Sequence, residues 1–484
     1  MIGYVLVGIA LLLMTIILLY QAYGFGYRNG EVIQNGLVYV SSVPNPASIY
    51  INGQKRSETT NTRLLLEAGQ YTFQLNRDGY HTWKRAITVD GGAVVHFDYP
   101  FLFPAKLTTT NVKKYTARPA LFAQSPDRRW AMVQSDAYNT FDVYDLNSQP
   151  LKAPTAFTIA PTAFTTTAGA NSLQLVKWAD DNKHVVLQHI ANDKGAITTE
   201  YILIDRTDPT ATVNLTKTLG INPTKLELRN DKYDGYFLYN QTDQTLQRVA
   251  LNSSTTPQLL LDHVLAYKTY GDNVILYATT AGAGPGKVAI KLQDGNQTFT
   301  LREVTPSATY LLDLTKYSGD WFVGVGSSVE SRTYVYKNPA QTMRDKPKNP
   351  LVPVQVLKTK EPNYISFSEN ARFIVVENGT QFGIYDAEND KGYAYTLPDA
   401  MDAPQTHATW MDGHRLMYTS SGKLVVFEFD NANHEVLSTN DPNYMPFFDP
   451  NYKWLYTFAD QPATATTPAQ FNLLNTALRT PQDQ

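Results

Sequence analysis

The sequence contains no cysteine among its 484 residues. This absence excludes disulfide bonds, thiolate nucleophiles, iron–sulfur clusters and zinc sites with cysteine ligands. It also excludes a lipid anchor attached to an N-terminal cysteine. A chain without thiols cannot form mispaired disulfides in an oxidising compartment, so this composition suits an exported protein.

The chain also lacks an excess of positive charge. Its 41 lysines and arginines are balanced by 44 aspartates and glutamates, which gives a net charge of -3. Proteins that bind nucleic acid usually carry a strong positive field that neutralises phosphates. We therefore expect no nucleic-acid partner.

Catalytic sequence motifs are absent as well. No Gly-x-Ser-x-Gly, His-Glu-x-x-His or Walker sequence occurs in the chain. Gly24, Gly26 and Gly30 follow a hydrophobic run and precede no expected helix, so they do not predict a phosphate-binding loop. We expect no catalytic residue, no cofactor and no bound metal.

The eight histidines are scattered. His184 lies close to His189, and His407 lies close to His414; on adjacent strands either pair could hold a metal. Histidines at the surface or with satisfied hydrogen bonds are the more common case.

Four aspartates recur at equivalent positions of the sequence repeat that begins at residue 122. They are Asp145, Asp205, Asp313 and Asp386. Their recurrence favours a structural role in turns.

Only one long hydrophobic run occurs, from Ile2 to Tyr20, and it contains no charge. A helix of this length is about 28 Å long, close to the hydrocarbon thickness of a bilayer. Tyr20 and Tyr23 lie where interfacial aromatic residues are expected. The run therefore predicts a single-pass transmembrane anchor at residues 1–23, a membrane contact through Ile2–Tyr20, and a short linker at residues 24–35.

Residues 36–100 predict a small β-sandwich. Asn52-Gly53 and Asp78-Gly79 are turn signals between short runs of β-branched and aromatic residues. Tyr71 to Leu75 alternates aromatic and polar side chains, as expected for a half-buried strand. Six or seven short strands in this length imply two packed sheets.

This stretch resembles a PEGA domain. The residues that carry the resemblance are a strand leading to Ser-Val-Pro44, the turn Pro44-Asn-Pro-Ala47, the strand end Asn52-Gly53, the turn Ala68-Gly69-Gln-Tyr71, and Gly79-Tyr80. The usual Pro-Glu-Gly-Ala turn is altered, and Ala68 stands where proline is typical. The resemblance implies a bacterial or archaeal cell-envelope setting and a non-catalytic spacer or adhesive role.

From residue 122 onward the chain repeats a pattern of strand, turn, aromatic strand and a further strand. The turns lie about 40 to 53 residues apart, which is the spacing of four-stranded propeller blades. They are Asp127, Asp180, Asp231, Asp272, Asp320, Asn370, Asp412 and Asn451.

The repeat predicts a seven- or eight-bladed β-propeller at residues 122–478, so the whole chain is expected to be all-β after its anchor. Blades must stack radially because one blade cannot bury both of its faces. Residues 101–121 form a connector. Its segment Lys106–Val112 is a candidate to complete the last blade beside Phe471–Leu474.

Two turn sequences resemble those of TolB-type propellers. They are Ser125-Pro-Asp-Arg-Arg-Trp130 and Ser366-Phe-Ser-Glu-Asn-Ala-Arg-Phe373. The resemblance implies a platform that binds other proteins.

Three segments are poor in residues that could be buried and predict loops: residues 150–171, residues 337–362 and the tail from Asp460. The second is basic and could contact an anionic polymer or lipid head groups. The residues proposed for this contact are Arg344, Lys346, Lys348, Lys358 and Lys360.

Together these observations predict a membrane-anchored, extracytoplasmic binding or scaffold protein of the bacterial cell envelope. The PEGA-like module would be a spacer or wall contact, and the propeller would bind a protein or glycan. An envelope hydrolase or lyase with its site on the propeller face is the alternative, and it requires at least three titratable side chains around the central channel. A sensor with a cytoplasmic output is a third hypothesis.

Overall fold

The computed structural model describes residues 2–22, 25–28, 31–252, 256–461 and 470–483. Parts of the predicted anchor and linker (residues 1, 23–24 and 29–30) and of the predicted tail loop (residues 462–469) lie outside the described residues. The chain divides into two compact units. The first comprises Met1–Thr108, Ala432–Glu435 and Ala477–Gln484, and the second comprises Thr109–Asn431 and Val436–Thr476.

The predicted transmembrane helix is not supported. Helix α1 (Ile2–Ala22) covers most of the predicted anchor. A membrane-spanning helix needs about 20 consecutive, predominantly apolar residues. Among the residues that the structure describes, no helix combines sufficient length with sufficient apolarity to cross a bilayer. The predicted fold class is therefore wrong in its transmembrane helix, and both units are built from β-sheets.

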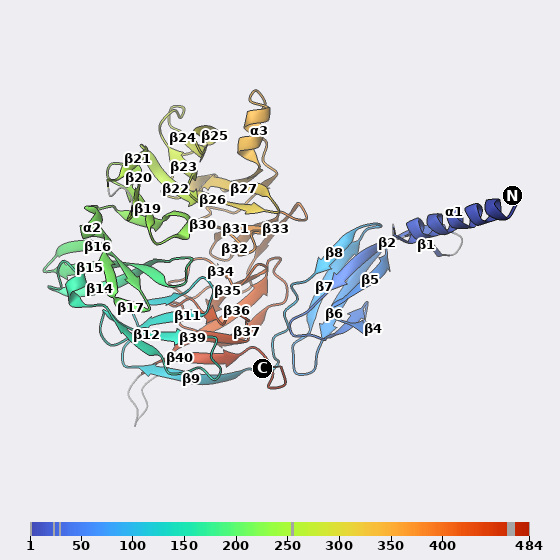
Figure 1. Ribbon diagram of the computed structural model, residues 1–484, viewed down its shortest axis with the longest axis horizontal. Coiled ribbons are helices and arrows are strands. Elements are labelled where there is room, and N and C mark those ends of the chain that lie inside the picture. Colours follow the sequence, from blue (N-terminus) through green and yellow to red (C-terminus); the bar gives the residue numbers. More distant parts are fainter. Residues whose placement is uncertain (1, 23–24, 29–30, 253–255, 462–469, 484) are drawn as a thin grey trace. The chain divides into compact units, whose positions relative to one another are not determined.

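The described residues of the first unit form two four-stranded sheets (Figure 1). In one sheet β2 pairs with the three other strands; the members are β1 (Phe25–Arg28), β2 (Glu31–Val40), β5 (Thr62–Glu67) and β8 (Val94–Phe97). The predicted linker at residues 24–35 therefore contains β1 and the start of β2. The other sheet has the order β4 (Gln54–Thr59), β3 (Ser48–Ile51), β6 (Gly69–Asn76) and β7 (Trp83–Val89). The turn between β3 and β4 is Asn52-Gly53, and both residues have positive φ, at 50° and 80°.

Aromatic side chains join the two sheets of the first unit. Phe97 of β8 meets Phe73 of β6 edge to face at 5.4 Å and Trp83 of β7 at 5.5 Å between ring centroids. All three side chains are buried. The two sheets thus share one core, as expected for a sandwich.

The C-terminal residues belong to this first unit. The Tyr80 hydroxyl donates to Asp483 at 2.8 Å and accepts the backbone N–H of Thr480 at 2.9 Å. Arg77 forms an ion pair with the same carboxylate. The polar side chains of the first unit therefore hold the last described residues.

The described residues of the second unit form eight four-stranded antiparallel sheets that follow one another along the chain (Figure 1). The first four, with strands in sequence order, are β10 (Phe122–Gln124), β11 (Trp130–Gln134), β12 (Thr140–Asp145) and β13 (Thr155–Thr158); β14 (Ala170–Trp178), β15 (His184–Asp193), β16 (Ala196–Asp205) and β17 (Asp208–Asn214); β18 (Lys225–Leu228), β19 (Gly235–Asn240), β20 (Thr245–Ala250) and β21 (Gln258–Leu261); and β22 (Val264–Tyr270), β23 (Val274–Thr279), β24 (Val288–Asp294) and β25 (Gln297–Val304).

The next three sheets have the same order. They are β26 (Tyr310–Tyr317), β27 (Asp320–Ser327), β28 (Arg332–Lys337) and β29 (Gln355–Leu357); β30 (Tyr364–Phe367), β31 (Phe373–Asn378), β32 (Gln381–Asp386) and β33 (Lys391–Thr396); and β34 (Thr409–Trp410), β35 (Arg415–Ser420), β36 (Lys423–Glu428) and β37 (Glu435–Thr439). Two short helices, α2 (Leu215–Leu219) and α3 (Pro339–Asp345), lie in connections between strands. Because α3 lies within residues 337–362, this predicted loop is not wholly a loop.

The eighth sheet takes its fourth strand, β9 (Thr108–Tyr115), from the N-terminal end of the second unit. Its order is β38 (Phe447–Phe448), β39 (Trp454–Gln461), β40 (Gln470–Ala477) and β9. The predicted pairing of the connector strand beside Phe471–Leu474 is therefore confirmed. We number the sheets as blades 1 to 8 in the order of their first strands.

A shared core joins the first and last blades. Tyr144 of blade 1 and Phe458 and Phe471 of blade 8 are buried in one hydrophobic cluster with Tyr115 of β9. Phe458 and Phe471 stack at 5.6 Å between ring centroids. Since blade 1 packs against blade 8, the ring is closed, and the β-propeller-like fold is confirmed.

The recurring turns owe their shape to short polar side chains. In blade 1 the Ser125 hydroxyl bonds to Asp127 at 2.5 Å and accepts the backbone N–H of Trp130 at 2.9 Å. Arg128, between them, has a φ of 59°. Ser368 and Asn370 make the same contacts in blade 6, with Phe373 as the N–H donor. The Ser-x-Asp/Asn spacing thus specifies the turn between the first two strands of a blade.

We expect Phe471→Ala to lower the free energy of unfolding by about 3–5 kcal/mol, because it leaves a cavity in the core that closes the ring. Chemical denaturation of the full chain measures this change. Val436→Ala is the control, since Val436 is 60% exposed and its truncation should change stability by less than about 0.5 kcal/mol. Equal stability of the two variants would contradict the role assigned to this core.

Candidate functional site

The first strands of the blades line the central channel of the ring. A cavity of about 870 Å³ lies against five consecutive first strands, β14, β18, β22, β26 and β30. Since only the strand nearest the axis of a ring can approach its equivalents in several other blades, this cavity is part of the central channel. It has the size of a typical ligand pocket.

Three lysine–carboxylate pairs line the cavity. Lys177 pairs with Asp231, Lys225 pairs with Glu227, and Lys268 Nζ lies 3.2 Å from Asp313 Oδ1. The positive and negative charges of these six side chains cancel. The cavity is therefore polar without carrying a net charge.

Lys268 and Asp313 form the pair whose carboxylate is most buried. The Asp313 side chain is 10% exposed, whereas that of Lys268 is 51% exposed. Asp313 also accepts the backbone N–H of Phe367 at 3.0 Å, which fixes its orientation. Burial opposes the charge on Lys268, but the carboxylates of Asp313 and Glu227 outweigh it and raise the pKa of Lys268. The ammonium group therefore remains charged at neutral pH and is suited to binding rather than to accepting a proton.

Neutral polar and aromatic side chains complete the cavity wall. The Tyr201 hydroxyl donates to the carbonyl of Thr224 at 3.2 Å and accepts from Gln188 at 3.3 Å. The Tyr270 ring is 39% exposed and meets Trp321 edge to face at 4.8 Å between centroids. These contacts hold the rings in place before any ligand arrives.

Turn residues of blades 1, 6, 7 and 8 contact one another. Arg128 of blade 1 pairs with Glu369 of blade 6 and stacks over the Tyr452 ring of blade 8 at 4.4 Å. The Tyr452 hydroxyl donates to the carbonyl of Met411 in blade 7 at 3.0 Å. In contrast, the turn residues Asn230 and Asp231 of blade 3 line the cavity. The cavity is thus lined by residues of blades 2 to 6.

A buried carboxyl group lies on β31 of blade 6. Glu377 of β31 is fully buried; one of its oxygens accepts the backbone N–H of Ala408 at 2.8 Å, and the other has no hydrogen-bond partner among the described residues. Burial raises the pKa of Glu377 well above its ordinary value, and the hydrogen bond from Ala408 opposes only part of this effect. A substrate cannot reach this group, so it is not a candidate acid.

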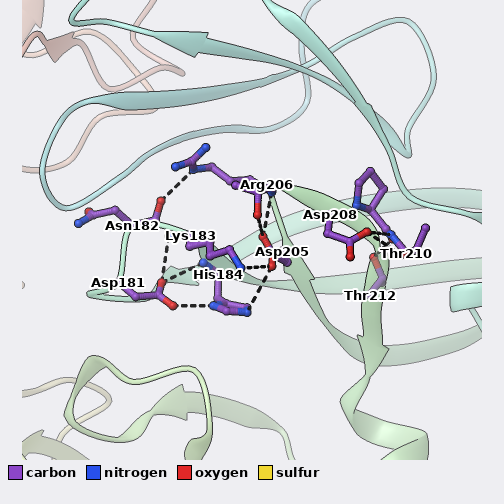
Figure 2. Close-up of polar contacts among 11 residues, drawn as sticks. Asp181, Asn182, Lys183, His184, Asp205, Arg206, Asp208, Thr210 and Thr212 are labelled. Atoms are coloured by element: carbon purple, nitrogen blue, oxygen red, sulfur yellow. Dashed lines mark hydrogen bonds and ion pairs between the residues drawn. The ribbon is translucent and has the colours of Figure 1, made fainter.

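A second polar cluster lies in blade 2 at the start of β15 (Figure 2). Asp181 contacts the His184 ring at 2.5 Å, and Asp205 contacts the Lys183 ammonium at 2.5 Å. Burial alone would raise the pKa of Asp205, but hydrogen bonds from Lys183 and Thr207 lower it. Asp181 also accepts the backbone N–H groups of Lys183 and His184, so the cluster holds a turn.

The recurring aspartates have two different roles. Asp145, Asp205 and Asp386 each accept a backbone N–H two residues later, at 2.8 to 3.1 Å, as the sequence predicts for turns. Asp386 is fully buried and binds Arg372 through two hydrogen bonds. Asp313 differs, because it lies in a first strand and lines the cavity.

The histidines do not come together as metal ligands. His189 is buried, and its two ring nitrogens contact Glu200 at 2.8 Å and Asn171 at 2.9 Å. His184 stacks on Tyr233, and His407 stacks on Tyr364. Over the described ranges no group of three potential metal-binding side chains occurs.

The basic residues proposed for an anionic polymer lie in and beyond α3. Arg344 pairs with Asp294 at 2.5 Å, donates to Gln297 at 2.7 Å and lies over the Phe299 ring, so blade 4 already engages it. Lys346, Lys348, Lys358 and Lys360 are exposed. Their contact with an anionic polymer stays a prediction.

Sequence reasoning missed the cavity lysines. A lysine occurs in the first strand of blades 2, 3, 4 and 5; these are Lys177, Lys225, Lys268 and Lys316. The recurrence of a lysine once per repeat is the sequence signal that could have predicted these positions. The first three line the cavity, whereas Lys316 lies over the Trp321 ring at 4.7 Å.

Comparison with protein-family models gives one match, which is to the PEGA domain. Residues 35–102 are a PEGA domain. This match covers the two sheets of the first unit from β2 onward. It confirms the resemblance seen in the sequence.

Solved structures with similar folds share little sequence with the chain. Hsv2 of Kluyveromyces lactis is 11% identical, over 75% of this chain and 98% of that one, with a TM-score of 0.37. The dihydro-heme d1 dehydrogenase NirN in complex with DHE is 12% identical, over 70% and 67%, with a TM-score of 0.40. No curated protein matches the chain. The propeller-like fold therefore rests on the sheets themselves.

We expect Glu377→Gln to change how stability depends on pH. The unfolded carboxyl loses its proton above its ordinary pKa of 4.5, whereas the folded one keeps it. The free energy of unfolding of the natural protein should therefore fall relative to the variant as the pH rises above 4.5, by up to about 1.4 kcal/mol per pH unit. Denaturation curves at pH 4, 5.5 and 7 measure this difference.

The control for this prediction is Glu361→Gln, because Glu361 is exposed. This variant should follow the natural protein at each pH. A Glu377→Gln curve that also follows the natural protein would contradict a neutral, buried Glu377.

Proposed function

We propose that the protein is a binding or scaffold protein of the bacterial cell envelope. The PEGA domain serves as a spacer or wall contact, and the propeller-like ring holds a protein or glycan ligand. The observation that supports this proposal best is the channel cavity of about 870 Å³ with its three lysine–carboxylate pairs. Its polar groups are paired and held in place, which suits recognition of a ligand.

Two turns resemble those of TolB-type propellers, and this resemblance implies a platform that binds other proteins. We therefore include a protein partner in the proposal. In two blades these turns adopt the same serine-based hydrogen bonding. The exposed lysines Lys346, Lys348, Lys358 and Lys360 would add a contact with an anionic envelope polymer.

An envelope hydrolase or lyase is the second candidate, because the cavity has more than three titratable side chains. Their pairing favours binding over catalysis. Glu227 and Asp313 each face a lysine, and the raised pKa of Lys268 removes it as a base at neutral pH. An acid–base mechanism needs a group that can change its protonation state near the working pH.

The proposal predicts that the amount of envelope material that the protein retains depends on the cavity. Immobilised full-length protein, incubated with detergent-solubilised envelope extract, should retain protein or carbohydrate above the level of a blank support. Replacing two cavity ammonium groups, in Lys225→Met/Lys268→Met, should reduce this amount at least tenfold, because Glu227 and Asp313 lose their partners and the cavity becomes acidic.

The matched control is Lys391→Met, since Lys391 is an exposed lysine on the outer strand of blade 6. Equal retention by all three proteins would contradict binding in the cavity. Release of new sugar reducing ends or peptide amino termini from the extract would instead favour the hydrolase or lyase. Protease accessibility in intact cells tests the envelope location.

A further inference from the structure

We propose that the ligand of the channel cavity is a neutral, polyhydroxylated glycan segment. This inference rests on the proposed binding function of the ring and adds the chemical class of the ligand. Three features of the cavity carry it: balanced charge, a wall of hydrogen-bonding groups and an exposed aromatic ring.

The balance of charge disfavours an anionic or cationic ligand. Each cavity lysine already faces a carboxylate, so the charges are balanced and a charged ligand gains little net attraction from the cavity. A neutral hydroxyl group can donate to the carboxylate while it accepts from the ammonium group of the same pair. The pairs then remain intact when the ligand binds.

The remaining wall offers neutral polar groups. Thr224, Thr269 and Thr315 line the cavity together with Gln188 and Tyr201. These threonines come from three consecutive blades, so donors and acceptors are distributed round the cavity rather than gathered at one point. A ligand with hydroxyl groups along its whole length matches this distribution.

Tyr270 supplies an apolar surface for a sugar ring. It lines the cavity, is 39% exposed, and makes an edge-to-face contact with Trp321. The apolar C–H face of a sugar can pack on such a ring while its hydroxyl groups reach the polar wall. One fixed ring beside polar groups suits a ligand that has both kinds of surface.

An extended peptide fits the cavity less well. A peptide that binds as an added strand is recognised through pockets that receive alternate side chains. Of the apolar lining residues, Leu226, Leu228 and Leu314 are buried, with 1%, 4% and 3% exposure, whereas Leu175 is 40% exposed and offers one apolar contact, fewer than a series of alternate side chains would use. The observations therefore favour a glycan over a peptide.

Isothermal titration calorimetry of the full chain tests this inference with four probes. They are cellotetraose and chitotetraose as neutral glycans, tetragalacturonate as an acidic glycan, and an Ala-Gly hexapeptide. We expect at least one neutral tetrasaccharide to bind, and its Kd to be at least tenfold lower than those of the acidic glycan and the peptide.

Variants locate the binding. Tyr270→Ala should raise the Kd of the neutral glycan about three- to tenfold through loss of stacking, and Thr269→Ala should raise it severalfold through loss of a hydrogen bond. Thr300→Ala, an exposed position on the outer strand of the same blade, is the control and should leave the Kd unchanged. Circular dichroism melting verifies that each variant is folded.

Two results would overturn the inference in distinguishable ways. If neither neutral glycan binds but the peptide or the acidic glycan does, and Tyr270→Ala weakens that binding, the ligand class is wrong and the binding function stands. If no probe binds and the lysine double variant retains as much envelope material as the natural protein, both the ligand class and the proposed function fail.

Discussion

Closure of the ring is the constraint on which the second unit depends. Each blade has two apolar faces and can bury them only against its neighbours. The first and last blades are far apart in sequence, and they meet because β9 adds to the sheet of β38, β39 and β40. The aromatic cluster of Tyr115, Tyr144, Phe458 and Phe471 then fills the junction. Without this junction two sheet faces and a strand edge would be exposed to water.

The closed ring also creates the candidate site. Closure brings the first strands of all blades toward one axis, where side chains from distant parts of the sequence come within reach of one another. Lys268 and Asp313 are an example, since they lie on separate blades and meet at 3.2 Å. Arg128 of blade 1, by contrast, contacts Glu369 of blade 6 and Tyr452 of blade 8. The cavity is lined by residues of several blades and not by any single blade.

Much of the local structure was predictable because short-range hydrogen bonds specify it. The Asn52-Gly53 hairpin, the serine-based turns of blades 1 and 6, and the turn role of Asp145, Asp205 and Asp386 depend on residues within a few positions of each other. The period of the turns likewise indicated the blades, and the PEGA resemblance was confirmed. The basic segment after residue 337 was less well predicted, because α3 and the pairing of Arg344 with Asp294 depend on blade 4.

The sequence by itself determined the sheets, their turns and the PEGA domain, since backbone preferences and alternating side chains are encoded locally. The membrane-spanning helix that the hydrophobic run Ile2–Tyr20 predicts is wrong, because no helix among the described residues is long and apolar enough to cross a bilayer. Only the tertiary structure decided that the ring has eight sheets among its described residues, and that Asp313 faces a channel instead of a turn. The reason is physical: the pairing of Lys268 with Asp313 depends on how two neighbouring blades pack against each other, and no single segment of the sequence encodes that packing.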